Sequence, residues 1–450
     1  MSAAIHEHLH APNRFAVIPT GVRLNADPQY TGKGVTIAFL DSGFYPHPDL
    51  LEPRNRVLFY QDITGERDSL DTSDPAESWQ WHGTQTSIVA AGNGHLSDGV
   101  YKGLANESQL VLVKVSRNGR ITEENIARGI KWIIANRERF NIRVLNISLG
   151  GDDDVPCTRS IIDRAAEEAI SKGIVVVAAA GNSGDMRSIP PANSPSVITV
   201  GGYHDNNQID GTSLNLYHSN FGPTADGTVK PELVGPAMWV AAPILPGTNL
   251  YARAEALSQL AAAPGVEDIL RDLKIVATHY QHVDGTSFAA PIVTSIVAQM
   301  LEANPTLTPG TIRNILISTA DRIMDAPAIR QGFGVVNARR AVELAKQEQH
   351  TLNVVGCSPP RVRDGQLVFV YHDDEAWAVS LAAEFNGWNP GTTRLTKDAT
   401  GLWLCSVATP GPGRYEYKFV VDEQRWIEDP SNGVRVPDGF GGLNSVIVIQ

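Results

Sequence analysis

The sequence has little of what a disulfide-stapled or membrane-spanning protein needs. Only three of its 450 residues are cysteine (Cys157, Cys357 and Cys405), and they are far apart with no CxxC pair. This excludes a disulfide framework and a thiolate zinc site, and it predicts reduced thiols that pack as small apolar groups. We therefore expect a cytoplasmic protein. The longest apolar run, residues 174–180, is far too short to cross a bilayer.

Positive charge is also scarce. The chain has 37 Lys and Arg residues against 49 Asp and Glu, a formal net charge of −12. Nucleic acids and anionic membranes require a basic face, so we expect neither as a partner. The first ten residues contain no basic stretch followed by an apolar one, so they do not predict a secretory signal. Hydrophobic residues make up 42% of the chain, enough for a sizeable core and too many for a disordered protein.

Residues 34–344 alternate apolar β-branched runs with amphipathic stretches. The expected strands are 35–40, 110–115, 144–147, 174–178 and 197–200, and the expected helices are 84–91, 123–135 and 160–172. Strands of nearly continuous hydrophobicity are covered on both faces, and strand–helix–strand repetition implies a parallel sheet. The pattern predicts a three-layer α/β domain. Residues 247–280, rich in Ala, Leu and charged residues, predict a helical insertion.

The pattern changes after Ala345. Residues 346–365 contain Pro359-Pro360 and predict a linker. Short alternating runs then recur between turns, which predicts a small Ig-like β-sandwich. These runs are 367–371, 376–382, 403–408, 415–421 and 446–449. The expected organisation is a tail (1–16), an α/β domain (17–345), a linker (346–365) and a sandwich (366–450).

Four short motifs follow strands or begin helices in the first domain, where open parallel sheets place their sites. They are Asp41-Ser-Gly43, His82-Gly-Thr84, Gly181-Asn182-Ser-Gly184 and Gly285-Thr-Ser287. A serine hydroxyl attacks an acyl carbon when a histidine takes its proton, and a buried carboxylate fixes that histidine. An amide side chain and a backbone N–H at a helix start can bind the oxyanion. The four motifs supply all of these groups.

In this order, the motifs resemble those of the subtilisin-like serine peptidases, the subtilase family. Residues 146–151, 230–236 and 332–337 extend the resemblance, which spans about 17–345. It implies an endopeptidase that hydrolyses peptide bonds of proteins or peptides through an acyl-enzyme. By the same resemblance, Asp41 orients His82, His82 is the general base and acid, Ser287 is the nucleophile, and Asn182 donates to the oxyanion.

The resemblance also implies how substrate binds. Ser148, Leu149 and Gly150 on one side, and Ala179, Ala180 and Gly181 on the other, would flank the substrate backbone as strands. The uncharged wall 178–181 favours an apolar P1 side chain, although Asp185 and Arg187 lie close enough in sequence to reach that pocket.

The resemblance predicts no cofactor. Many relatives bind a structural calcium ion in the loop that corresponds to residues 92–101. Here Asn93 and Asp98 stand in unfamiliar spacing, so calcium is not predicted. The resemblance starts near Val17, which leaves no room for a folded pro-domain and favours an intracellular peptidase.

A second pattern occupies residues 366–450. The runs 385–390, 415–422, 425–430 and 443–448 resemble the glycogen-binding module of the AMP-activated kinase β subunit and of starch-branching and debranching enzymes. The resemblance implies that Trp388 and Trp426 stack on glucose rings, while Lys418 and Asn444 bond the hydroxyls of glycogen or a related α-glucan. Gly442 departs from the pattern, because the family has threonine there.

Two alternatives remain open from sequence. The chain can be a catalytically silent scaffold of peptidase fold that binds glycan and peptides. It can also be a peptidase whose second domain serves only dimerisation or internal docking, with the two tryptophans in a core.

Overall fold

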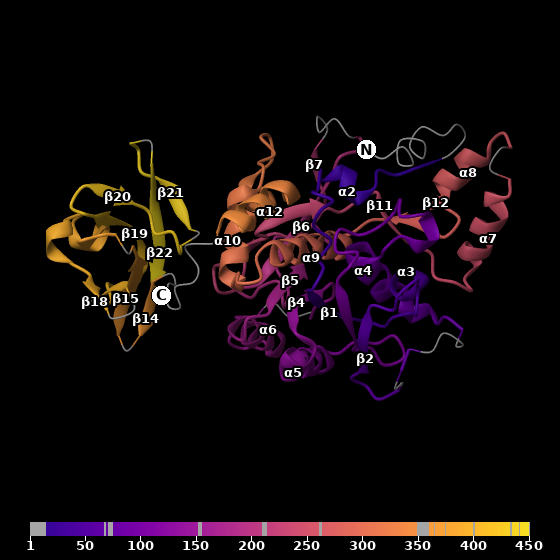
Figure 1. Ribbon diagram of the computed structural model, residues 1–450, viewed down its shortest axis with the longest axis horizontal. Coiled ribbons are helices and arrows are strands. Elements are labelled where there is room, and N and C mark those ends of the chain that lie inside the picture. The colour runs from indigo at the N-terminus through magenta and orange to yellow at the C-terminus, as the bar shows by residue number, and fades with distance from the viewer. Residues whose placement is uncertain are drawn as a thin grey trace. The chain divides into compact units, whose positions relative to one another are not determined.

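The computed structural model describes residues 15–66, 69–70, 75–151, 155–208, 214–260, 263–348, 360–363, 365–373, 375–398, 401–432, 434–440 and 442–449. The chain divides into two compact units, an N-terminal unit (1–346) and a C-terminal unit (347–450) (Figure 1). Most of the predicted tail and the central part of the predicted linker lie outside the described residues.

A largely parallel sheet of eight strands forms the middle of the N-terminal unit. Its order is β10-β6-β5-β4-β1-β3-β2, and β7 pairs with β6 in the antiparallel sense. The bounds are β1 (Thr36–Asp41), β2 (Val57–Asp62), β3 (Gln109–Lys114), β4 (Ile142–Ile147), β5 (Val175–Ala179), β6 (Ile198–His204), β7 (Asn215–Leu216) and β10 (Leu233–Pro236). All five predicted strands are present. Strand β2 was missed because it lies at the edge and exposes part of its length.

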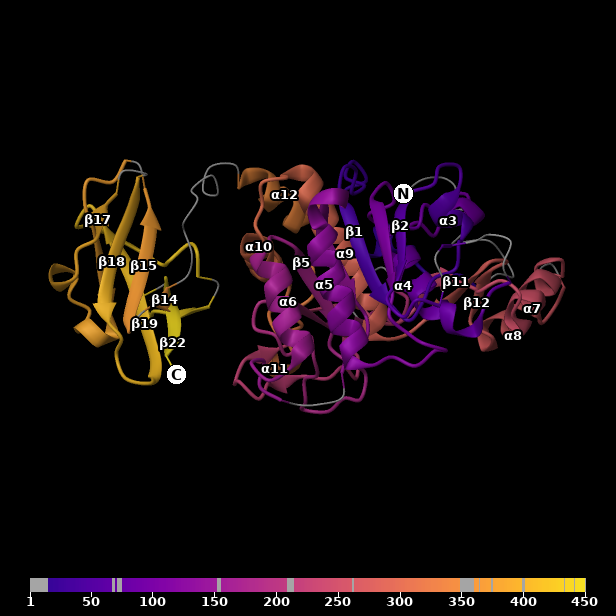
Figure 2. The same ribbon diagram turned by 90° about the horizontal axis from the view of Figure 1, so that it is seen from below.

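Helices cover both faces of this sheet, which confirms the predicted three-layer fold. On one face, Ala38 and Leu40 share a core with residues of α5 and α6, which lie in front of the sheet in Figure 2. Ile37 and Phe39 point the other way and are fully buried on the face where α4 and α9 pack. The longer helices are α4 (Trp81–Ala91), α5 (Glu123–Phe140), α6 (Ile161–Ser171), α9 (Thr286–Ala303), α10 (Pro309–Thr319) and α12 (Ala338–Gln347).

Short elements complete the unit. They are α2 (Thr20–Arg23), α3 (Pro48–Leu51), α11 (Ala328–Gln331), the 3₁₀ turns η1 (Ser78–Gln80) and η2 (His95–Ser97), and the paired strands β8 (Gly222–Pro223) and β9 (Val229–Lys230). No helix in the described part of the chain is both long and apolar enough to span a bilayer.

The predicted helical insertion contains two helices, α7 (Asn249–Ser258) and α8 (Val266–Asp272), which lie side by side in Figure 1. They enclose a small core that includes Ala254 and Leu270. The helical prediction is wrong for the end of the segment. There, β-branched Ile275 and Val276 belong to β12 (Ile275–Ala277), which pairs with β13 (Tyr280–Val283) and, through it, extends to β11 (Val240–Pro243).

Two antiparallel sheets form the C-terminal unit, as the sandwich prediction requires. One has the order β14-β15-β18-β17, and the other has β16-β19-β22-β21 with β20 paired to β19. Their buried faces meet in one core that includes Phe369, Leu381 and Phe419. The bounds are β14 (Arg361–Arg363), β15 (Gln366–His372), β16 (Val379–Ala383), β17 (Thr396–Lys397), β18 (Leu402–Ala408), β19 (Gly413–Val421), β20 (Arg425–Ile427), β21 (Arg435–Pro437) and β22 (Leu443–Ile449), with η3 (Glu384–Asn386) and η4 (Pro390–Thr392).

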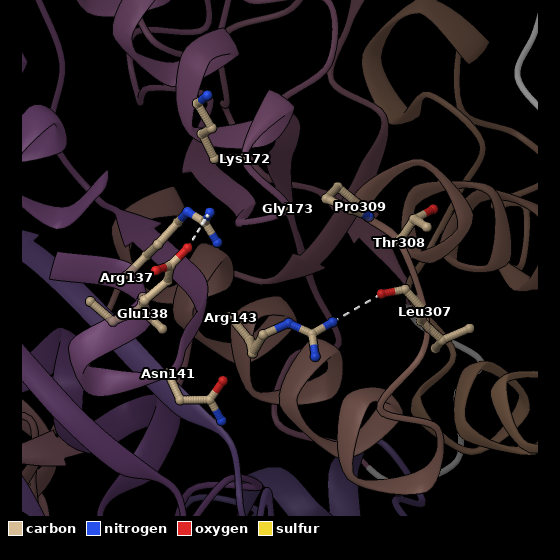
Figure 3. A pocket seen from close by; sticks show the side chains of 10 residues that line it. Arg137, Glu138, Asn141, Arg143, Lys172, Gly173, Leu307, Thr308 and Pro309 are labelled. Atoms are coloured by element: carbon tan, nitrogen blue, oxygen red, sulfur yellow. Dashed lines mark hydrogen bonds and ion pairs between the residues drawn. The ribbon is translucent and has the colours of Figure 1, made fainter. Parts of the chain in front are cut away.

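A pocket of about 300 Å³ lies at the amino ends of the parallel strands (Figure 3). Asn141 and Gly173, which line it, precede β4 and β5, so this is the edge opposite to the four motifs. Within it, Arg143 donates to the carbonyl oxygens of Pro305 and Leu307 at 2.8 and 3.0 Å. These bonds anchor the start of β4 to the loop between α9 and α10.

A buried ion cluster holds the β10 end of the sheet. Lys230 and Glu232 are each 1% exposed, and their Nζ and Oε1 atoms lie 2.8 Å apart. Arg313 of α10 places Nη2 2.9 Å from the same carboxylate. Burial alone raises the pKa of Glu232, but the two cations outweigh it and lower that pKa. The carboxylate is therefore charged, and it is the counter-ion that both cations require.

We expect Glu232→Ala to lower the free energy of unfolding by about 3–5 kcal/mol, because it leaves Lys230 charged and buried without its carboxylate. Urea unfolding of both proteins measures the change, in a Ser287→Ala background chosen against the self-digestion that the sequence resemblance predicts. The matched control is Glu267→Ala, which breaks a half-exposed pair with Arg271 in α8 and should cost less than about 1 kcal/mol. Equal losses for the two variants would contradict the expectation.

Candidate active site

Asp41 and His82 form a short hydrogen bond in the candidate site. Asp41 ends β1 and His82 lies in the first turn of α4, with Oδ1 and Nδ1 2.7 Å apart. The Asp41 side chain is 1% exposed and that of His82 is 20% exposed. Asp41 also accepts hydrogen bonds from the Ser42 N–H (2.7 Å) and the Thr86 hydroxyl (3.0 Å). With Nδ1 donating to Asp41, Nε2 of the neutral imidazole is left as the base.

Glycine at position 83 permits this contact. A Cβ on Gly83 would lie 2.2 Å from the Gly43 carbonyl oxygen and 2.9 Å from Asp41 Cβ. Any side chain would therefore push α4 away from the end of β1. The glycine of the His82-Gly-Thr motif is thus a packing requirement of the Asp41–His82 pair.

Ser287 lies in the first turn of α9, and a proline in that helix determines its surroundings. Pro291 has no N–H, so it cannot bond the carbonyl oxygen of Ser287 four residues earlier. The Ser148 hydroxyl donates to that oxygen instead, at 2.9 Å. In return, the Ser287 hydroxyl donates to the Ser148 carbonyl at 3.2 Å. This exchange fixes the first turn of α9, which carries the predicted nucleophile, to the segment that follows β4.

The residue after Ser287 places that turn beside the histidine. The rings of Phe288 and His82 have centroids 6.0 Å apart. In this state the Ser287 hydroxyl points to Ser148, and a rotation about its Cα–Cβ bond is needed to direct it to His82. Hydrogen bonds between catalytic groups are often long or poorly aligned when no substrate is bound.

Asn182 follows β5 and is oriented by a residue that the sequence analysis missed. Its side-chain oxygen accepts from the Thr286 N–H (2.8 Å) and the Thr286 hydroxyl (3.0 Å). Because the oxygen is held there, Nδ2 faces away from Thr286 and remains a donor. This is the orientation that an oxyanion donor needs. The signal in the sequence was the threonine directly before Ser287.

The predicted substrate strands differ from one another. Ser148, Leu149 and Gly150 continue beyond the end of β4, whereas Ala179 is the last residue of β5 and Ala180 follows it. The Gly181 N–H donates to the Thr286 hydroxyl at 3.1 Å, and its carbonyl accepts from the Asn220 N–H at 3.1 Å. Both backbone groups of Gly181 thus have partners within the protein, and pairing of Gly181 with substrate stays a prediction.

Trp81 is a second residue that the sequence analysis missed. It directly precedes His82, and its ring meets the imidazole edge-on with centroids 5.1 Å apart. Its exposed fraction is 46%, unusually high for tryptophan. It therefore presents an apolar surface to solvent beside the imidazole.

In the loop that corresponds to the calcium-binding loop of relatives, the Asn93 side chain is hydrogen-bonded within the protein. Asn93 donates to the Glu52 carbonyl at 2.6 Å and accepts from the His95 N–H at 3.0 Å. Among the described residues, no three His, Cys, Asp or Glu side chains are grouped so that they could hold a metal ion.

A second candidate site, here called the module pocket, lies in the C-terminal unit with a volume of about 570 Å³. All four residues predicted to bind sugar line it, namely Trp388, Lys418, Trp426 and Asn444. Trp426 is 46% exposed, so the alternative that it belongs to the core is wrong. The sequence analysis missed the other lining residues, which are Glu384, Glu416, Asp438 and Phe440.

Lys418 and Asn444, the two polar residues predicted to bind sugar, are each hydrogen-bonded to a carboxylate. Lys418 Nζ lies 2.5 Å from Asp438 Oδ2, and Asn444 Nδ2 donates to Glu416 Oε2 at 2.8 Å. Glu416 stands two residues before Lys418 on β19, on the same face of the strand. That spacing was the signal in the sequence, whereas Asp438 reaches the pocket only through the fold.

An Asp, a His, a Ser and an Asn gathered at the carboxyl edge of a parallel sheet are the residue types that a serine peptidase site requires. The comparisons with known proteins agree. Residues 32–336 match the model of the Subtilase family, and residues 354–432 match that of Carbohydrate-binding module 48 (Isoamylase N-terminal domain). The chain belongs to the subtilase family. It is a subtilisin-like serine endopeptidase with a carbohydrate-binding module.

Curated relatives support the same family. The chain is 35% identical over 323 residues to serine protease AprX of Bacillus subtilis, covering 69% of this chain and 67% of that protein. It is 29% identical over 355 residues to subtilisin E of the same species, covering 76% of each chain.

Solved structures share the fold. A protease from Pseudoalteromonas arctica superposes with a TM-score of 0.53 at 25% identity, over 76% of this chain and 97% of that one. The protease domain of PatA, in a mutant form, gives a TM-score of 0.51 at 21% identity, over 73% and 99% of the two chains.

The electrostatics of His82 determine the pH range in which it can act. Burial of the imidazole lowers its pKa, but the charge of Asp41 and the bond to it outweigh burial, so the pKa of His82 is raised above its usual 6.5. A protonated histidine cannot accept the proton of serine. If His82 is the general base, as predicted, activity is lost as pH falls through the raised pKa of His82 and is complete only above it.

We expect the acid limb of the kcat/KM profile to have its midpoint above pH 6.5. Asp41→Asn should move that midpoint to lower pH and reduce kcat by about 10⁴-fold, because the amide no longer favours the charged imidazole or fixes its tautomer. Hydrolysis of a peptide substrate from pH 5 to 9 measures both effects. An unchanged midpoint in the variant would show that Asp41 does not act on His82.

Proposed function

We propose that Asp41, His82 and Ser287 form the catalytic triad, and that the C-terminal unit directs the peptidase to glycogen or a related α-glucan. The observation that carries the first part is the 2.7 Å bond between buried Asp41 and His82, set beside the nucleophile turn of α9. The observation that carries the second is the common pocket of Trp388, Lys418, Trp426 and Asn444.

In the first step, the Ser287 Oγ attacks the carbonyl carbon of the scissile bond and His82 Nε2 takes its proton. Asp41 stabilises the imidazolium that results. The negative charge on the former carbonyl oxygen is bound by Asn182 Nδ2 and by the backbone N–H of Ser287. When the C–N bond breaks, His82 gives its proton to the leaving amine, and the acyl group stays on Ser287.

Water completes the cycle. His82 takes a proton from the water as it attacks the acyl carbon, and the second tetrahedral intermediate uses the same oxyanion donors. When the C–O bond to Ser287 breaks, His82 returns the proton to the serine oxygen. The peptide acid leaves and the enzyme is restored.

The substrate would lie along the segment after β4. Leu149 and Gly150 extend past the end of that strand and can pair with an extended peptide. On the other side, Ala179 and Ala180 offer an uncharged wall for the P1 side chain. Ile189 lies within 3.3 Å of a Cβ placed on Gly150, so the neighbouring loop adds apolar surface too. Together these residues favour an apolar P1 side chain.

We expect a fluorophosphonate probe to label the purified protein, and Ser287→Ala to abolish labelling, because the probe reacts only with an activated serine. In-gel fluorescence measures this, with Ser183→Ala as control, since that serine lies beside Asn182 but outside the triad. Labelling of neither the wild type nor the control would favour the catalytically silent scaffold that binds glycan and peptides.

We expect the protein to be retained on immobilised glycogen, and Trp426→Ala to weaken retention about tenfold, because a stacking face is lost. The matched control is Trp377→Ala, which removes a tryptophan that is 66% exposed but does not line the module pocket. Affinity electrophoresis in glycogen-containing gels measures the change. Equal mobility with and without glycogen would leave docking or dimerisation as the role of the module.

A further inference from the structure

One carboxylate organises the polar side of the module pocket. Asp438 Oδ2 lies 2.5 Å from Lys418 Nζ, and the two side chains are only 11% and 10% exposed. Asp438 Oδ1 accepts from the backbone N–H groups of Phe440 and Gly442 at 2.8 and 2.9 Å. Asp438 therefore fixes both the lysine and the turn that presents Phe440.

Glycine at position 442 makes room for this carboxylate. A Cβ there would lie 2.7 Å from Asp438 Oδ2 and 3.5 Å from Lys418 Nζ. Any side chain at position 442 would displace the carboxylate from the lysine. Glycine in place of the family's threonine at position 442 is thus what allows Asp438 to pair with Lys418.

The pairing leaves a definite set of groups for a ligand. A carboxylate has about four acceptor positions, and within the described part of the chain three of those on Asp438 are filled. Lys418 uses one of its three donors on Asp438. Among the described residues, one acceptor of Asp438 and two donors of Lys418 therefore remain side by side, which matches the donor and acceptor character of a sugar hydroxyl pair.

The charges of the pocket are unbalanced. Its lining has three carboxylates, those of Glu384, Glu416 and Asp438, against the single cation Lys418. The bond from Lys418 and the N–H groups of Phe440 and Gly442 lower the pKa of Asp438 to about 2. Asp438 therefore stays ionised at neutral pH, and Lys418 is already neutralised before a ligand arrives.

The aromatic side of the pocket does not discriminate by charge. Trp388, Trp426 and Phe440 offer apolar faces, and Phe440 is 96% exposed at the rim. Such faces stack on a glucose ring whether or not it carries a phosphate. Selection between charged and uncharged sugars must come from the carboxylates and Lys418.

We propose that Asp438 makes the module pocket selective for uncharged glucan, and that it excludes glucan bearing phosphate or carboxylate groups. The inference rests on the proposed function, because it takes α-glucan as the ligand. Asp438 accepts a hydrogen bond from a hydroxyl of the neutral sugar, and it neutralises Lys418, the one cation among the described residues that line the pocket.

The test compares maltoheptaose with maltoheptaose carrying one phosphomonoester, by isothermal titration calorimetry on the full-length chain with Ser287→Ala. We expect the neutral sugar to bind at least tenfold more tightly. Asp438→Asn should weaken maltoheptaose several-fold and reduce the preference below about threefold, because it frees Lys418 and removes one negative charge. Glu423→Gln, an exposed carboxylate outside the pocket, is the matched control and should change neither affinity.

A second variant, Lys418→Gln, separates loss of selectivity from loss of folding. It should increase the preference for neutral maltoheptaose, whereas Asp438→Asn decreases it, and it should weaken binding of the phosphorylated sugar further. A misfolded pocket would lose both ligands in both variants. Equal binding of the two sugars by the unsubstituted pocket, or an unchanged preference in Asp438→Asn, would overturn the inference while the proposed function stands. Binding of neither sugar would overturn the proposed function and the inference with it.

Discussion

The exchange of hydrogen bonds between Ser148 and Ser287 is the constraint on which the active site depends. It exists because Pro291 cannot donate to the carbonyl oxygen of Ser287, which leaves that oxygen for the Ser148 hydroxyl. Asn146 donates to the same hydroxyl at 3.0 Å and accepts from Thr294 at 2.9 Å, so α9 is tied to β4 over two turns. The proposed nucleophile Ser287 and the segment after β4, which is proposed to pair with substrate, are thereby positioned together.

Burial strengthens the electrostatic interactions of several charged groups in this chain, because little water screens them. Asp41 is 1% exposed, so its charge acts on His82 through little water and raises the pKa of the imidazole despite burial. The same logic applies to Glu232 between Lys230 and Arg313, where the carboxylate serves stability. In the module pocket, the side chains of the Asp438–Lys418 pair are also largely buried, and the proposed role of the pair is selection of a ligand. One kind of interaction thus serves three purposes, according to what lies beside it.

Much of the fold could be predicted because its signals are local. The strands at 35–40 and 174–178 are continuous apolar runs, and such runs form buried parallel strands. The prediction failed at 275–277 because two β-branched residues at the end of a helical stretch pair with β13, a partner that the sequence does not show. Strand β2 was missed for a related reason: an edge strand is half exposed and lacks a clear pattern.

For the sites, the sequence by itself determined which residues are predicted to carry the chemistry, because motifs such as Asp41-Ser-Gly43 and Gly285-Thr-Ser287 specify residue type and local turn together. Only the tertiary structure decided how those residues are held. Three hydrogen bonds hold them: Thr86 bonds Asp41, Thr286 bonds Asn182, and Asp438 bonds Lys418. The partners in these bonds are 20 to 104 residues apart in the chain. Hydrogen bonds of this kind depend on distance in space, and spacing along the chain does not encode that distance.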